Sequence, residues 1–243
     1  MKELVDILEK NGLAEHLDPS KVIQESERLS HSNPLNTLGD LVQWLDNEKA
    51  NNHIFQKRVG LNTLDQWHFD EDGYFSHIEG KYFKIVGMKV TSPSREVNTW
   101  SQPILDNVGT GIIGLLLKRE NNNLYFLMRA RAEVGNRHIV QLGPTVEINP
   151  GNYMYNRKLK KPFLIEEFQS PTRFIKLWEN RLSEEGGKFY KEEHLHRILM
   201  LPDGIDLKTP SVYRWISYDQ MRFFLHMGES VNSCARSILA CLI

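Results

Sequence analysis

Apolar residues in positions 1–57 recur at the three- and four-residue spacing that is typical of helices. This spacing predicts helices over residues 4–13 and 19–29, and a third helix that Thr37 caps at its start. Trp44 falls on the apolar stripe of the third helix, so we expect it in a hydrophobic core. The first 57 residues are therefore expected to form a helical N-terminal extension without chemistry of its own.

From residue 58 onwards the pattern changes to the alternation of strands. Within it, residues 163–185 carry apolar side chains three or four apart and predict a long helix that ends at Gly186-Gly187. Two more helices are expected to begin at Ser217 and Ser230. Strands are expected over residues 82–90, 100–104, 111–118, 124–131, 138–143, 145–148, 195–201 and 213–216. This order predicts an α+β domain over residues 58–243, with a mixed β-sheet core and flanking helices.

Composition excludes several classes of protein. A net charge of −1 over 243 residues gives no general attraction to nucleic acid or to an anionic membrane. No apolar run of 18 residues is present, so no membrane span is predicted and a cytoplasmic protein is expected. Cys234 and Cys241 lie seven residues apart in a helical pattern, which predicts two buried thiols rather than a disulfide.

Candidate chemistry is concentrated in residues 124–155. Arg129, Arg131 and Glu133 alternate with small residues, so on a strand they would share one face. Two guanidinium groups on one face suit the binding of phosphate. Gly135-Asn136 predicts the turn of a hairpin. An equally simple interpretation is an amphipathic hairpin whose charged face is solvated.

The same stretch resembles a known family. From Phe126 it reads FLMRARAEVGNRHIVQLGPTVEINPGNY. This is similar to the pattern F-L-V-Q-A-K-x-E-P-G-N-x-x-x-x-Q-L-S-P-T-V-Q-A-T-x-S-N-Y of the NDP-hexose 2,3-dehydratases. Arg129 and Arg131 replace a usual glutamine and lysine, and Glu147 replaces a usual glutamine. The likeness extends in order over about residues 60–243, through Trp67–Asp70, Trp100–Ile104, Gly111–Gly114, Ser183–Gly186, Trp215 and Val231–Leu242.

The resemblance implies a fold like that of the Nudix hydrolases. The end of the Nudix box matches Leu182–Gly187, but Thr172 stands where its upstream glutamate would be, and Asn180-Arg181 replaces Arg-Glu. The carboxylate cluster that would hold Mg²⁺ is therefore incomplete. We expect the helix of the box to remain as a scaffold, with no metal site and no pyrophosphate hydrolysis. Members of the family carry two such halves and this chain carries one, so a homodimer that restores the pair is expected.

The implied substrate is a dTDP-linked 4-keto-6-deoxyhexose that loses its C2 hydroxyl, and no cofactor is needed. Glu133 is the first choice as base, with an ion pair to Arg131 as the equal alternative. Arg131 is also a catalytic candidate, because Arg129 and Arg131 would bind the diphosphate or polarise the 4-keto oxygen. Tyr153 and His138 are candidates for proton donation, although His138 matches no family position and Tyr153 also suits a core. The implied substrate-binding residues are Trp67, Trp100, Gln102, Arg129, Asn136, Gln141, Thr145, Glu147, Asn152 and Arg236.

Several alternatives remain open at this point. Trp67 or Trp100 could stack on the nucleobase or belong to a core, and Arg236 could reach a phosphate or cap its helix. An epimerase or isomerase of nucleotide sugars begins with the same removal of the C3 proton. A catalytically silent nucleotide-sugar binder, or one half of a two-chain assembly, would also fit the pattern.

Overall fold

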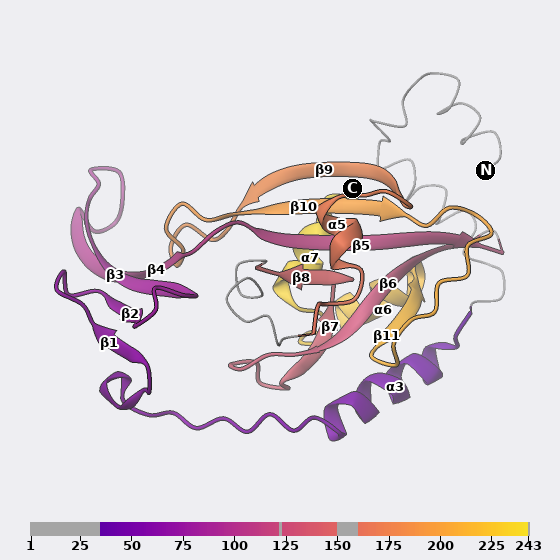
Figure 1. Ribbon diagram of the computed structural model, residues 1–243, viewed down its shortest axis with the longest axis horizontal. Helices are drawn as coiled ribbons and strands as arrows, with labels where there is room; N and C mark the ends of the chain where they lie inside the picture. The colour runs from indigo at the N-terminus through magenta and orange to yellow at the C-terminus, as the bar shows by residue number, and fades with distance from the viewer. Residues whose placement is uncertain (1–34, 122, 150–159, 243) are drawn as a thin grey trace, which may run out of the picture.

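The computed structural model describes residues 35–121, 123–149 and 160–242. These residues form a four-stranded sheet and a seven-stranded sheet, with α-helices packed on the larger one. Figure 1 shows the small sheet as a separate layer at the left and the large sheet across the middle. The α+β class with a mixed sheet and flanking helices, which the sequence predicts, is confirmed.

The small sheet is a single antiparallel layer with the strand order β1-β2-β3-β4. The short 3₁₀ helix η2 (Leu61–Thr63) precedes it. β4 is the edge strand, as expected for a segment that contains Pro103. The strands are β1 (Trp67–Phe69), β2 (Phe75–His77), β3 (Phe83–Thr91) and β4 (Thr99–Asn107).

The large sheet has the strand order β11-β6-β5-β10-β9, and two short strands pair off this path. β7 pairs with β6 and β8 pairs with β5. β5 and β10 run parallel and the other pairs run antiparallel, so the sheet is mixed. The strands are β5 (Gly111–Glu120), β6 (Asn123–Ala132), β7 (Val140–Gly143), β8 (Val146–Ile148), β9 (Ile175–Ser183), β10 (Glu193–Met200) and β11 (Tyr213–Ser217).

Three of the helices begin at side-chain caps. Thr37 and Ser217 each form a capping box, and these two predicted starts are confirmed. The last helix is capped by Asn232, two residues after the expected Ser230. The helices are α3 (Leu38–Ala50), α5 (Ile165–Gln169), α6 (Tyr218–His226) and α7 (Ser233–Ala240).

Two hydrophobic cores lie on the large sheet. The first joins α3, α6 and α7 to the sheet and contains Trp44, as expected. The second contains Phe168 of α5 together with Leu127 and Tyr213. The predicted helix that contains Trp44 is thus part of the main core. The expected helices over residues 4–13 and 19–29 lie outside the described residues.

The prediction of a long helix over residues 163–185 is wrong. Only the five residues of α5 are helical there, and the nine-residue strand β9 follows after a bend. The matched end of the Nudix box therefore does not lie on a scaffold helix. Leu182 lies in β9, and Gly186 and Gly187 lie in a turn of the loop that follows this strand.

A β-bulge explains the misleading pattern. The register of β9 on β10 shifts between Ile198 and Leu199, and Leu177 has no partner across the pair. Two consecutive residues, Leu177 and Trp178, consequently both pack against the first core. The extra residue breaks the alternation of a regular strand and leaves apolar spacings of three and four. Single-sequence periodicity therefore favours a helix where a bulged strand is present.

The C-terminal tail is buried within its own chain. Val231, Ala235, Ile238 and Leu242 all belong to the first core. Cys234 and Cys241 are both free thiols, as expected, but they are half-buried and not fully buried. Across the described part of the chain, no helix is long and apolar enough to span a membrane.

The contact between β5 and α5 yields a stability prediction. Gly114 lies against the ring of Phe168, and a Cβ atom at Gly114 would overlap that ring. Phe168 is fully buried, so the ring has no free space to move into. We expect Gly114→Ala to lower the free energy of unfolding by about 1–3 kcal/mol, measured by urea denaturation.

The matched control is Gly186→Ala, where a new Cβ would meet no atom within 4 Å. The control should leave stability within about 0.5 kcal/mol of the wild type. Equal stability of the two variants would contradict the close packing of α5 on β5.

Candidate functional site

The large sheet forks where β5 and β6 separate. The two strands pair only through residues 117–120 and 123–126. Further along, residues 112–114 of β5 pair with β8, and residues 129–132 of β6 pair with β7. The loop over residues 133–139 joins β6 to β7 and replaces the tight hairpin that Gly135-Asn136 predicts. Polar side chains of the predicted site gather in this fork.

Arg131 spans the fork from β6 to β8. Its Nη1 donates to the backbone oxygen of Glu147 at 3.0 Å, and its Nη2 forms an ion pair with Glu133. Its Nε lies 3.4 Å from the Glu147 carboxylate, an ion-pair distance without the alignment of a hydrogen bond. Three predicted site residues, Arg131, Glu133 and Glu147, are thus brought together.

The first turn of α7 supports this cluster. The side-chain amide of Asn232 donates to the Glu147 carboxylate at 2.8 Å, while its oxygen accepts from the Ala235 amide at 2.8 Å and caps α7. Burial, followed by the negative charge of Glu147, raises the pKa of the Cys234 thiol and keeps it protonated. Sequence reasoning missed Asn232, although Val231-Asn232 lies in the matching tail and was the available signal.

Arg129 differs from Arg131 in its partners. Its guanidinium lies 5.9 Å from the centre of the Tyr213 ring, and its Nε is buried. No described carboxylate lies within ion-pair distance of it, and its Nε has no hydrogen-bond partner in the described part of the chain. Among the described residues, therefore, no carboxylate neutralises the charge of Arg129.

A second group of polar residues surrounds the loop between β6 and β7. Gln141 donates to the backbone oxygen of Glu229 at 2.7 Å. The Glu229 carboxylate lies 3.4 Å from Nε2 of His138 and 3.6 Å from Arg137. His138 is largely exposed, and the backbone oxygen of Asn136 accepts from Ile139 within the loop. These residues adjoin the fork through β7 and stay predictions as substrate contacts.

Thr145 is fully occupied by the protein itself. Its hydroxyl donates to the Leu127 oxygen at 2.6 Å and accepts from the Leu116 amide at 2.8 Å. Its relative exposure is 0%, so it offers no atom to a ligand in this structure. The expectation that Thr145 contacts the sugar is therefore corrected: its hydroxyl links β6 to β5 by hydrogen bonds.

The two predicted tryptophans lie in the small sheet, whereas Arg129 and Arg131 lie in the large one. Trp67 packs with Phe83 at 4.9 Å between ring centres, which favours the core interpretation. Trp100 donates to Gln102 at 2.8 Å, and Gln102 donates to the Gly187 oxygen at 2.8 Å.

The remaining predicted contacts are local or undescribed. Arg236 is exposed on α7 and donates to the Val231 oxygen at 2.8 Å, a contact near the start of its own helix. Tyr153 and Asn152 lie outside the described residues. Both stay predictions.

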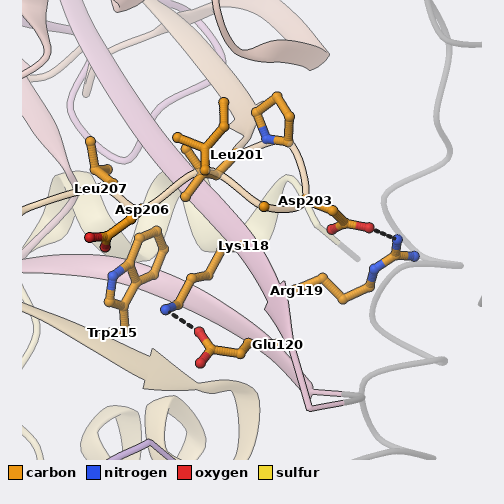
Figure 2. Close-up of a pocket in the computed structure, with 11 residues that line it drawn as sticks. Lys118, Arg119, Glu120, Leu201, Asp203, Asp206, Leu207 and Trp215 are labelled. Atoms are coloured by element: carbon orange, nitrogen blue, oxygen red, sulfur yellow. Dashed lines mark hydrogen bonds and ion pairs between the residues drawn. The ribbon is translucent and has the colours of Figure 1, made fainter.

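A cavity of about 120 Å³ opens at the other end of β6, beside the β5–β6 turn. Figure 2 shows Lys118 beside Glu120, and Arg119 beside Asp203. The Lys118–Glu120 and Arg119–Asp203 ion pairs are 2.5 and 2.7 Å long, and Lys118 lies 4.8 Å from the Trp215 ring centre. Both cations are already paired, and none of the predicted site residues lines this cavity.

Two histidines of β10 form another polar group. His194 lies 3.3 Å from both Glu184 and Glu192, and its Nδ1 faces the Gly111 amide at 3.2 Å. His196 lies between the His194 backbone oxygen and the Ser237 hydroxyl of α7. Within the described ranges, no group of three or more His, Cys, Asp or Glu side chains is arranged to hold a metal ion.

The fold and the fork together define a class. The class is an α+β domain whose forked sheet places Arg131 between two carboxylates, with Arg129, which has no carboxylate partner among the described residues, on the same strand. The model of the NDP-hexose 2,3-dehydratase family matches residues 38–242. The chain belongs to this family.

Curated relatives agree with the family assignment. A dTDP-4-dehydro-6-deoxy-alpha-D-glucopyranose 2,3-dehydratase of Saccharopolyspora spinosa is 31% identical over 88% of this chain and 44% of its own length. The dehydratase of the same name from Streptomyces violaceoruber is 33% identical over 86% of this chain and 47% of its own length. The chain thus spans less than half the length of these relatives. Among solved structures, an ADP compounds hydrolase aligns at 14% identity with a TM-score of 0.37, over 66% of this chain and 84% of its own.

The buried histidine gives a pH prediction. Burial, followed by the neighbouring His194, lowers the pKa of His196 below its ordinary 6.5. The folded protein therefore binds fewer protons at this site than the unfolded chain does. Its contribution to stability is complete above about pH 6.5 and is lost as the pH falls toward the lowered pKa. The urea midpoint should fall between about pH 7.5 and about pH 5, and His196→Asn should make that fall smaller.

The control is His53→Asn, because His53 is exposed. This variant should keep the pH dependence of the wild type. An unchanged pH dependence in His196→Asn would show that His196 is not the group that resists protonation.

Proposed function

We propose that this chain supplies a site for removing the C2 hydroxyl of a dTDP-linked 4-keto-6-deoxyhexose, to give a 3,4-diketo-2,6-dideoxy sugar. The observation that carries the proposal is Arg131, held between Glu133 and Glu147, next to the unpaired Arg129. The reaction needs a base, a cation near the developing enolate and a grip on the diphosphate. The family match and the names of the relatives favour this reaction.

The two arginines suit different tasks. Arg129 has no carboxylate partner among the described residues, so it is free to bind the diphosphate. Arg131 is held by its partners and suits a fixed position at the 4-keto oxygen, where negative charge develops. A pre-positioned cation lowers the barrier because it does not reorganise during the reaction.

The two carboxylates also differ. The Glu147 side chain is 17% exposed and accepts from Asn232, whereas the Glu133 side chain is 39% exposed and, among the described residues, pairs only with Arg131. A carboxylate whose oxygens already accept from protein donors has fewer free lone pairs to turn toward a substrate proton. We therefore keep Glu133 as the base in this proposal, and give Glu147 the task of holding Arg131.

The proposed steps balance without a cofactor. Glu133 takes the proton from C3, and the electron pair forms an enolate whose oxygen at C4 faces Arg131. The enolate expels the C2 hydroxyl, which leaves as water after it receives a proton. The resulting enol at C3 becomes a ketone when C2 gains a proton. One water molecule is lost, and the oxidation at C3 balances the reduction at C2. Tyr153 and His138 stay candidates for the proton donor.

The test is to incubate the protein with the 4-keto dTDP-sugar in D₂O, with excess EDTA. Loss of the C3 proton and of the C2 oxygen, with deuterium incorporated at C2, is the expected result. Deuterium exchange at C3 without loss of oxygen would indicate an epimerase or isomerase, and binding without either would indicate a silent binder. Turnover that disappears in EDTA and returns with Mg²⁺ would contradict the proposed cofactor-free route.

The role of the base is tested with Glu133→Gln. Glutamine keeps the size of the side chain but cannot accept a proton at neutral pH. We expect turnover to fall by at least ~100-fold, while affinity for dTDP stays within about threefold, because Glu133 acts on carbon and not on phosphate. The matched control is Glu193→Gln, which breaks a similar ion pair with Arg181 at a distant sheet edge and should keep turnover. Near-normal turnover in Glu133→Gln would make Glu147 the next candidate.

We further propose that the chain acts as a homodimer through its small sheet. The relatives are more than twice as long as the segment that this chain matches, so they have room for two such regions. The tail and α3 contact their own core and leave little apolar surface for a partner. Phe69, Ile78 and Tyr82 of the small sheet are instead exposed, and Phe69 is 60% exposed.

Light scattering at micromolar concentration should then give twice the chain mass of 28.3 kDa. Phe69→Glu combined with Ile78→Glu should give the monomer mass, because charge at a buried contact is unfavourable. Leu225→Glu is the control, since Leu225 is also apolar and exposed, at 38%, but lies on α6. A wild type that runs as a monomer and remains active would rule out this dimer.

A further inference from the structure

We propose that Asn232 is a positioning residue that fixes the direction of the Arg131 guanidinium through Glu147. This inference rests on the proposed function, in which Arg131 faces the developing enolate. Asn232 does not contact the proposed substrate atoms. It acts from α7, an element that none of the implied catalytic residues occupies.

The first step is that one side chain performs two tasks. The Asn232 oxygen accepts from the Ala235 amide at 2.8 Å and caps α7. Its amide nitrogen donates to Oε2 of Glu147 at 2.8 Å. Serine, threonine and aspartate cap helices equally well, but they do not combine an acceptor with a donor of this reach. Only asparagine both caps α7 and holds the carboxylate.

The second step connects Glu147 to Arg131. The same Oε2 atom lies 3.4 Å from Nε of Arg131, and the Glu147 backbone oxygen accepts from Nη1 at 3.0 Å. Nη2 is left to meet Glu133. A guanidinium is planar and rigid, so contacts on Nε and Nη1 determine where Nη2 points. The position of the Glu147 carboxylate therefore sets the geometry of the Arg131–Glu133 pair.

The third step is that α7 is itself fixed next to the fork. The Leu142 amide donates to the Ser230 oxygen at 2.8 Å, and the Asn232 amide donates to the Leu142 oxygen at 2.9 Å. These backbone hydrogen bonds tie β7 to the residues before α7. A Cβ atom at Gly143 would lie 3.3 Å from both the side-chain carbons of Arg131 and the side-chain nitrogen of Asn232. Glycine at this position lets the strand, the arginine and the cap come close together.

The test uses Asn232→Ser, which keeps a capping side chain and removes the donor to Glu147. We expect kcat for the proposed dehydration to fall about 10- to 100-fold, because Arg131 is no longer held in one direction. The affinity for dTDP should stay within about threefold, because Arg129 and not Arg131 is assigned to the diphosphate. Asn232→Asp should lose at least as much, because its carboxylate would face that of Glu147.

Thr37→Ala is the control for a lost helix cap. Thr37 forms the capping box of α3, far along the chain from the fork. This variant should lose comparable thermal stability and keep kcat. If Asn232→Ser retains the kcat of the wild type, or if it loses only as much kcat as Thr37→Ala, the positioning role is overturned.

A second measurement separates this inference from the proposed function. The melting temperatures of Asn232→Ser, Arg131→Lys and the double variant form a cycle that does not depend on turnover. We expect the double variant to lose clearly less than the sum of the single losses, because both changes break the same network. Additive losses would overturn the inference even in an active enzyme. A wild type that fails to dehydrate the substrate, with non-additive losses, would overturn the proposed function alone.

Discussion

A charged side chain, Arg131 of β6, crosses the fork in the large sheet and reaches β8. Once β5 and β6 separate, each strand still has backbone groups that need partners, and β7 and β8 supply them. The fork is closed on its interior by the Thr145 hydroxyl, which reaches both strands, and by Arg131, which spans from β6 to β8. A partly buried guanidinium is costly unless it is paired, so the carboxylates around Arg131 follow from its place in the fork.

The burial of the C-terminal tail is what brings α7 to this fork. Ala235 and Ile238 on one side of the helix belong to the core formed with β5 and β7. Because this packing fixes the helix, its first turn faces Glu147 and not water. The apolar residues of the tail and the polar residues of the fork are thus parts of one arrangement. Ion pairs and hydrogen bonds near the surface contribute little free energy by themselves. The burial of the apolar tail therefore supplies the free energy that holds these polar groups in place.

Some features could be predicted from the sequence because they depend on local chemistry. The caps Thr37 and Ser217, the edge strand with Pro103, and the shared face of Arg131 and Glu133 all follow from neighbouring residues. The expected helix over residues 163–185 failed because a bulge in β9 imitates helical spacing. The contact between Asn232 and Glu147 joins positions 85 apart in the chain, and no local pattern specifies such a pair.

The two neighbouring arginines show why a shared strand face does not imply a shared role. Arg129 and Arg131 alternate on β6, and from the sequence either could bind the diphosphate or polarise the 4-keto oxygen. Arg131 meets Glu147 because β8 lies across the fork, whereas Arg129 stands opposite Gly143 and near the Tyr213 ring. An aromatic ring attracts a cation without neutralising it, so Arg129 keeps its charge for a ligand. The difference in function proposed for the two arginines therefore arises from their neighbours on other strands.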